Sequence, residues 1–229
     1  MIFDIAKRVI GEIIKATTPQ QNNNWNTPEI EDTNAVKVES KEIKDVVDTL
    51  SMDGKLVYRY PVTGTPKVTS TYGPRELDYD GKKNPSYHYG IDLLGNDFQV
   101  RAPETMVIKK YVVPDMQHPA KFVKQGSHYV KAMPPQGKTW EDKSWGWTPY
   151  VTAVGIYSQR MYVFRHVKCL VPVGTKVDAG ESFAIYGQYG FCLGAHLHFE
   201  VYPFVEPAVK GTNYPKTVNP EKAFGNLKF

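Results

Sequence analysis

The stretch His196-Leu197-His198-Phe199-Glu200-Val201 decides the fold of this chain and points to its chemistry. Its residues favour a β-strand, and strand side chains alternate between two faces, so both histidines point the same way. Two imidazoles on one strand face are a typical part of a transition-metal site. A histidine pair alone is more often ordinary core or surface, so the rest of the chain must supply further ligands.

A second motif lies upstream, in Ser86-Tyr87-His88-Tyr89-Gly90-Ile91-Asp92. It joins a histidine to a carboxylate through Gly90, and glycine permits an unusual backbone turn. Zinc accepts both imidazole nitrogen and carboxylate oxygen, and catalytic zinc sites keep three protein ligands with a fourth position open for water. Closed structural sites recruit four ligands and favour cysteine. This pair and one histidine of the HLH triplet therefore make a set of three.

A third β-rich run, residues 160–167 (RMYVFRHV), carries His166. Read alone, it predicts an ordinary strand histidine. Four of the six histidines fall in these three short β-type segments, whereas His118 and His128 lie in a Pro/Gly-rich stretch. This clustering indicates that the four histidines share one site.

Together, these motifs resemble the lysostaphin-type zinc endopeptidases, which cut peptide cross-links in bacterial cell walls. The order of the motifs agrees, and the resemblance spans roughly residues 60 to 201. It implies a mainly β fold, an antiparallel β-barrel or sandwich of the duplicated hybrid motif type. The matching segments are 68–75 (VTSTYGPR) with the family's opening strand and turn, 88–92 with its HxxxD motif, 174–180 (GTKVDAG) with its G-x-x-V-x-x-G turn, and 196–200 with its HLHFE motif.

The resemblance also implies roles for individual residues. His88, Asp92 and His198 are expected to bind Zn²⁺, with His166 and His196 beside the metal. An imidazole there can take the proton of the attacking water and return it to the leaving amine. We assign that role to His196 and stabilisation of the oxyanion to His166, although one sequence also allows the two roles to be exchanged.

Three other groups lie near these motifs in the sequence. For Glu200 we expect a structural role, as the acceptor behind a zinc-bound histidine, in preference to that of a general base. Cys169 and Cys192 each sit close to a catalytic segment. A thiolate ligand or a disulfide is conceivable, but a buried free thiol is the commoner state for so few cysteines.

Composition predicts a globular β domain over residues 56–229, with one long insertion. Hydrophobic residues make up 41% of the chain, enough for one good core. Val, Tyr, Thr and Phe between Gly and Pro turns favour antiparallel strands. Residues 113–150 form an insertion where a short connection is expected. Two roles are open for its tryptophans and the lysines among them: they line a groove for a peptide or glycan, or they pack the loop-rich insertion onto the barrel. The tryptophans are Trp140, Trp145 and Trp147.

The first 55 residues have a different character. Apolar residues at helical spacing predict a short amphipathic helix over 1–16, too short and too charged to span a bilayer. Residues 17–39 read as a polar linker and 40–55 as a short helical connector. These 55 residues hold seven Lys/Arg and ten Asp/Glu, a net charge of −3, which leaves +7 for the rest. A basic domain suits an anionic cell wall, and no nucleic-acid motif supports the competing explanation.

The start of the chain lacks the pattern of a secretory signal. We therefore expect a bacteriophage protein, made in the host cytoplasm, that reaches peptidoglycan on lysis or as a virion component. Its N-terminal helix would dock onto a virion or tail protein, or self-associate. One alternative is a catalytically inactive lysostaphin-like scaffold or wall-binding module of a virion, which predicts broken site positions, whereas all five are intact. Another is a zinc peptidase that acts on proteins. The sequence leaves the host, the bond cleaved and the oligomeric state open.

Overall fold

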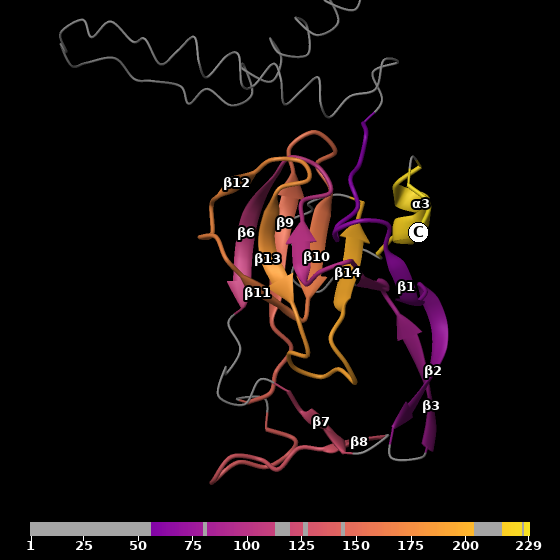
Figure 1. Cartoon of the computed structure of the whole chain (residues 1–229), viewed down its shortest axis with the longest axis vertical. Helices are drawn as coiled ribbons and strands as arrows, with labels where there is room; N and C mark the ends of the chain where they lie inside the picture. Colours follow the sequence, from indigo (N-terminus) through magenta and orange to yellow (C-terminus); the bar gives the residue numbers. More distant parts are fainter. Residues whose placement is uncertain are drawn as a thin grey trace, which may run out of the picture. The chain divides into compact units, whose positions relative to one another are not determined.

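The computed structural model is mainly β-strand, with one short helix in the described part (Figure 1). The predicted N-terminal helix, linker and connector lie outside the described residues. The prediction of a mainly antiparallel β fold is confirmed, because every pair of strands is antiparallel. The structure describes residues 56–79, 82–112, 120–125, 128–142, 145–203, 217–225 and 227–229.

The larger sheet has seven strands and carries two of the three predicted metal ligands, Asp92 and His198. Its central strands alternate buried and less buried side chains, as in Tyr150–Gly155, so that one face is turned to the core. In spatial order the strands are β1 (Lys67–Ser70), β4 (Ile91–Leu94), β14 (Leu197–Tyr202), β10 (Met161–Arg165), β9 (Tyr150–Gly155), β6 (Met106–Val112) and β12 (Lys176–Val177).

A three-stranded sheet packs against this face and closes a two-layer sandwich (Figure 1). Phe164 of β10 meets Phe183 of the smaller sheet with ring centroids 4.9 Å apart. Both side chains are fully buried, and burial of large apolar side chains is the main stabilising term of such a core. The strands, in spatial order, are β11 (Val167–Cys169), β13 (Ser182–Tyr186) and β5 (Gln99–Arg101).

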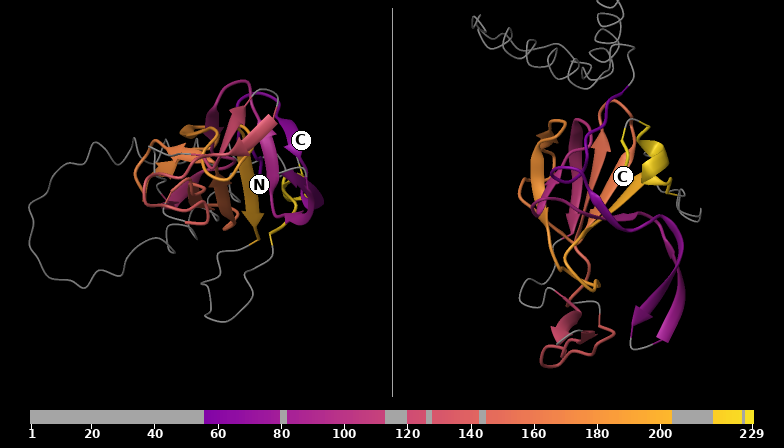
Figure 2. Two further views of the ribbon diagram at one scale, coloured as in Figure 1. Left: turned by 90° about the horizontal axis from the view of Figure 1, so that it is seen from below. Right: turned by 45° about the vertical axis from the view of Figure 1, so that its right-hand side comes forward.

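Two hairpins extend from the sandwich (Figures 1 and 2). One pairs β2 (Gly73–Tyr79) with β3 (Lys82–His88) and ends at a site histidine. The other pairs β7 (Phe122–Gln125) with β8 (His128–Lys131). This second hairpin belongs to the 113–150 insertion, which connects the neighbouring strands β6 and β9. The sequence predicted mostly loop in this insertion and did not predict the hairpin.

The chain ends with the short helix α3 (Pro220–Ala223), which packs beside β14. Phe224, just after the helix, stacks on Phe199 with ring centroids 5.8 Å apart. Among the residues that the structure describes, no helix has the length and hydropathy of a membrane span.

Candidate metal centre and proton-transfer site

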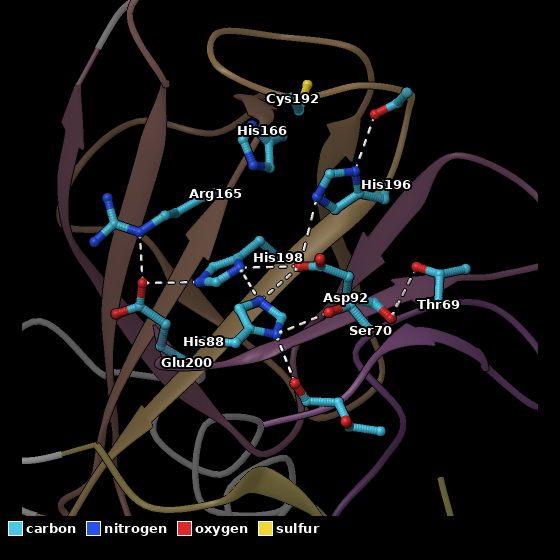
Figure 3. A network of polar contacts seen from close by, with 12 residues as sticks. Thr69, Ser70, His88, Asp92, Arg165, His166, Cys192, His196, His198 and Glu200 are labelled. Carbon is cyan, nitrogen blue, oxygen red and sulfur yellow. Dashed lines mark hydrogen bonds and ion pairs between the residues drawn. The ribbon is translucent and has the colours of Figure 1, made fainter. Parts of the chain in front are cut away.

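Three ligand atoms converge where β3, β4 and β14 meet (Figure 3). His88 is the last residue of β3, and Asp92 and His198 are direct partners across the β4–β14 pair. His88 Nε2 lies 3.1 Å from Asp92 Oδ1 and 2.8 Å from His198 Nδ1. His198 Nδ1 lies 2.9 Å from the same Asp92 oxygen. The structure therefore brings together the three residues predicted to be metal ligands, called the ligand half of the site below.

The outer nitrogens of the two imidazoles determine which atoms face this centre. His88 Nδ1 donates to the Thr71 carbonyl oxygen at 2.8 Å, because a carbonyl only accepts. His198 Nε2 likewise donates to Glu200 Oε1 at 3.0 Å. In the neutral rings, His88 Nε2 and His198 Nδ1 are then bare lone pairs that face each other and a carboxylate oxygen. Such a set repels itself unless a cation lies within it, and two imidazoles with one carboxylate suit Zn²⁺.

The electrostatics of the ligand half agree with a site for positive charge. Burial by itself raises the pKa of Asp92, but the close contacts of its carboxylate with the rings of His198 and His88 outweigh burial and lower the pKa. Burial lowers the pKa of His198, yet the hydrogen bonds to Asp92 and Glu200 outweigh it and raise the pKa. Both shifts in pKa therefore favour positive charge at this centre.

Glu200 lies behind His198, in the structural role expected of it. Its Oε1 accepts from His198 and from Arg165 Nε at 2.5 Å, and its Oε2 accepts from the Tyr202 hydroxyl at 2.9 Å. Burial raises the pKa of this carboxyl, but His198 and Arg165 outweigh burial and lower the pKa to about 2. An ionised acceptor fixes the ring of His198 and makes its Nδ1 a stronger ligand.

Arg75 contacts the ligand half, although the sequence suggested no role for it. Its Nη1 donates to Asp92 Oδ2 at 3.2 Å and to Ser70 Oγ at 2.8 Å, so it binds the Asp92 oxygen that does not face the histidines. Arg75 is the last residue of the VTSTYGPR motif, and its place in that motif was the only sign in the sequence of a link to the site. No spacing rule shows that β2 turns this side chain back toward β4.

Gly90 corrects one expectation about the HxxxD motif. The predicted unusual backbone turn is wrong, because Gly90 is not among the glycines with positive φ in the described chain. The reason for glycine is space. A Cβ at this position would lie 2.4 Å from the Phe199 carbonyl oxygen and 3.0 Å from His198 Nε2. Glycine therefore allows β4 to approach β14 closely enough for their ligands to meet.

His166 lies at a corner between the two sheets and not within a strand as its sequence suggested. It separates β10 of the larger sheet from β11 of the smaller one, and its φ of 61° is left-handed. Its N–H donates to the Pro149 carbonyl at 3.0 Å, and its carbonyl accepts from Gly187 N at 3.0 Å. Left-handed backbone is unfavourable for residues other than glycine and often marks a functional position.

His166 and His196 lie together, with ring centroids 4.6 Å apart, and are called the proton-transfer half of the site below, after the role predicted for them. His166 Nδ1 donates to the Tyr189 carbonyl at 2.7 Å, and His196 Nδ1 donates to the Gly194 carbonyl at 2.9 Å. His196 Nε2 lies 3.5 Å from Asp92 Oδ1. In both neutral rings Nε2 is thus left as an acceptor.

The pKa values of this pair point in the same direction. Burial and then the charge of His196 lower the pKa of His166 to about 3. Burial also lowers the pKa of His196, against the opposing charge of Asp92. Both rings are therefore neutral proton acceptors near pH 7. His166 can donate to an oxyanion only after it has taken up a proton.

Both cysteines are free thiols, which removes the disulfide alternative. Cys192 is buried beside the proton-transfer half, and its Sγ lies 3.6 Å from the Tyr189 carbonyl oxygen (Figure 3). Burial raises the pKa of this thiol to about 12, so it is protonated at neutral pH. Within the described parts of the chain, only His88, Asp92 and His198 group as potential metal ligands.

Comparison with known proteins gives structural neighbours only. No protein-family model and no curated protein sequence matches the chain. The catalytic domain of the antimicrobial peptidase lysostaphin from Staphylococcus simulans has 18% identity and a TM-score of 0.42, over 69% of this chain and 92% of that one. A zinc-containing peptidase from Vibrio cholerae has 23% identity and a TM-score of 0.40, over 66% and 41%. The SpoIIQ–SpoIIIAH pore-forming complex has 17% identity and a TM-score of 0.44, over 73% and 90%. At this level of similarity, the assignment of the site rests on the chain's own geometry.

Proposed function

We propose that this protein is a zinc-dependent endopeptidase that hydrolyses peptide cross-links of bacterial peptidoglycan. The observation that carries the proposal is the convergence of two bare imidazole nitrogens and one carboxylate oxygen within 3.1 Å of one another. Two further neutral imidazoles lie beside that centre. A scaffold that had lost catalysis would have no need for this complete set.

His88, Asp92 and His198 would hold the metal. Bound Zn²⁺ lowers the pKa of a water to near neutrality and polarises the scissile carbonyl. Arg75 keeps the Asp92 carboxylate oriented through its second oxygen, and Glu200 does the same for the His198 ring. These outer contacts hold the ligands in place before the metal arrives.

His196 accepts the proton of the attacking water in this proposal. Its Nε2 is bare and lies 3.5 Å from Asp92 Oδ1, which places it beside the metal centre. Once protonated, the ring can return the proton to the leaving amine. The attacking water releases one proton, so His166 can donate to the oxyanion only while that proton is on its ring, before it passes to the leaving amine. The resting state of both rings also supports the exchange of these two roles.

Two features support a cell-wall substrate. The motifs occur in the order found in the lysostaphin-type endopeptidases, and residues 56–229 carry a net charge of +7 that favours an anionic polymer. A zinc peptidase that acts on proteins would use the same chemistry, so substrate class has to be decided by assay.

The test is mass spectrometry of purified peptidoglycan after incubation with the zinc-loaded full chain. We expect new amine and carboxyl termini within the peptide cross-links, and none with chelator-treated protein or with the His196→Ala variant. A matched incubation with casein reports general proteolysis. Intact cross-links together with cleaved casein would reject the substrate assignment, and no cleavage of either would reject the activity.

We further propose that the protein is a bacteriophage component that opens the wall locally during infection or lysis. The amphipathic pattern of residues 1–16 and the polar stretch 17–39 support a tether to a virion or tail protein, or self-association. Proteomic analysis of purified particles tests this. Absence of the protein from the particles would favour a free lytic enzyme.

A further inference from the structure

One loop supplies both acceptors of the proton-transfer half. Residues 187–195 connect β13 to β14, and in this loop the carbonyls of Tyr189 and Gly194 accept from His166 and His196. The direction of these two carbonyls decides which nitrogen of each ring is bare. An isolated β-bridge between Gly187 and His196 closes the loop at its base, but no strand or helix spans the residues between them, which are held by contacts from elsewhere.

The 113–150 insertion makes those contacts from both of its ends. At one end, Lys121 N donates to the Gly190 carbonyl at 3.1 Å, next to Ala120, which forms a β-bridge with the same glycine. At the other end, Thr148 Oγ1 accepts from Phe191 N at 3.2 Å. Gly190 is left-handed with φ of 81°, and a Cβ on it would lie 2.3 Å from Thr148 Cα. The peptide group between Gly190 and Phe191, directly after the one that carries the Tyr189 carbonyl, is thus held at both its carbonyl and its N–H.

His166 itself is tied to the same segment. Its backbone N–H donates to the Pro149 carbonyl, the residue after Thr148. The insertion therefore contacts both the backbone of His166 and the peptide group next to the one that binds its ring. Aromatic packing reinforces this, because Phe191 of the loop contacts Phe122 and Trp140 with ring centroids 5.0 and 5.9 Å away.

Lys121 holds the insertion together from inside. Its side chain is buried, and its Nζ donates to the carbonyls of Trp140 and Asp142 at 2.7 and 2.8 Å. The same ammonium lies 5.3 Å from the ring centroid of Trp140 and 4.9 Å from that of Trp145. Cation–π contacts are strongest when desolvated. One cation therefore joins the start of the insertion to residues 140–145.

We propose that the insertion is a positioning clamp: Lys121 and Thr148 hold the 187–195 loop so that the Tyr189 carbonyl keeps His166 Nε2 bare and in place. They are positioning residues, because they act through the loop and not on the substrate. The consequence for turnover rests on the proposed function, whereas the consequence for the His166 ring does not.

The test compares Lys121→Met and Thr148→Val with the matched controls Lys138→Met and Thr148→Ser in the zinc-loaded full chain. Lys138 is partly exposed and pairs with Asp142 at the surface, and serine keeps the acceptor of Thr148. Nitrogen-15 NMR of the histidine rings reports the Nδ1–H tautomer of His166. Zinc content, kcat and KM are measured on the same samples.

We expect both clamp variants to lose the single Nδ1–H signal of His166 while both controls keep it. Because misplaced catalytic groups cost rate, kcat should fall about 10- to 100-fold with KM and zinc content unchanged. If Lys121→Met does not fold, Thr148→Val decides. A wild-type His166 signal in a folded clamp variant would overturn the proposal, and so would loss of zinc together with that signal. An inactive wild-type protein would reject the peptidase, and the NMR comparison would still decide the clamp.

Discussion

The two halves of the site are held in place by different parts of the molecule. The ligand half rests on paired strands, with Asp92 and His198 direct neighbours across β4 and β14. The proton-transfer half rests on carbonyls of a loop, which the insertion holds in turn. The formation of each strand follows from a short-range sequence pattern, whereas the position of the loop depends on contacts with a separate insertion. Metal binding and proton transfer should therefore be separable by mutation.

Removing a ligand should have the largest effect. His88→Ala or His198→Ala takes away one of only three protein ligands, so we expect turnover of peptidoglycan at background level, even with added zinc. The release of soluble wall peptides measures this. Zinc-dependent turnover in either variant would show that the ligand half is assigned wrongly.

Substitution in the proton-transfer half should lower the rate without loss of metal. For His196→Gln and His166→Gln we expect kcat to fall by about 10²- to 10⁴-fold, the usual contribution of a general acid or base, with KM near the wild-type value. Steady-state kinetics on a defined wall peptide checks this. The larger loss identifies the residue that takes the proton from water.

Loss of the charged acceptor behind His198 should weaken zinc binding without abolishing it. Glu200→Gln replaces the charged acceptor, and loss of such an outer partner typically weakens zinc binding by about 10- to 100-fold. Competition with a chromophoric chelator measures the affinity. Glu76→Gln, at an exposed carboxylate paired with Lys83, is the control and should bind zinc as the wild type does. Equal affinity of the two variants would contradict the role of Glu200.

The close approach of β4 to β14 should be sensitive to one methyl group. Gly90→Ala places a Cβ against the Phe199 carbonyl, so we expect a loss of about 1–3 kcal/mol in the free energy of unfolding, as for other overpacked sites. Urea unfolding of the metal-free protein measures it. Gly225→Ala, where an added Cβ meets nothing within 4 Å, should change little.

The two halves should also differ in their response to acid. His166 has a pKa of about 3 when folded, below the usual value of about 6.5 when unfolded. Between these values the unfolded chain binds more protons, so this contribution to stability is complete above pH 6.5 and is lost as the pH falls toward 3. For one such histidine the loss from pH 7 to 5 is about 2 kcal/mol.

Metal-free His166→Gln protein should therefore show a smaller decrease in stability over this range than the wild type. The lowered pKa of Glu200 acts only at lower pH, because that carboxyl has a usual pKa of 4.5 and a folded value of about 2. Urea unfolding at pH 7 and pH 5 separates the two. Identical slopes for wild type and variant would show that His166 is not a buried neutral group.

The ligand half could be predicted from sequence because its information is local. An HxxxD motif and an HxH triplet indicated a set of three ligands, and the resemblance to the lysostaphin-type endopeptidases selected His198 as the third; the structure brings these three side chains together. The reason for Gly90 was missed, because the close approach of β4 to β14 exists only in the folded sheet. Arg75 was missed for a similar reason, since its contact with Asp92 depends on how β2 lies against β4.

The sequence indicated which residues make up the proton-transfer half, but not how the backbone places them. The run around His166 read as one strand, but the structure splits it at a left-handed corner held by Pro149 and Gly187. The sequence also left two roles open for the tryptophans of the insertion, packing against the barrel or lining a groove. Trp145 is buried in the packing around Lys121, whereas Trp147 is 45% exposed, so the segment combines packing with an accessible aromatic surface.

Zinc content of two purified variants, His198→Ala and His196→Ala, tests the central claim most directly. These histidines lie two residues apart in the sequence, yet His198 is assigned to metal binding and His196 to proton transfer. Measured beside the wild type by mass spectrometry of the metal, His196→Ala should hold about one zinc per chain and His198→Ala essentially none. Equal zinc content in the two variants would contradict the division of the site into two halves.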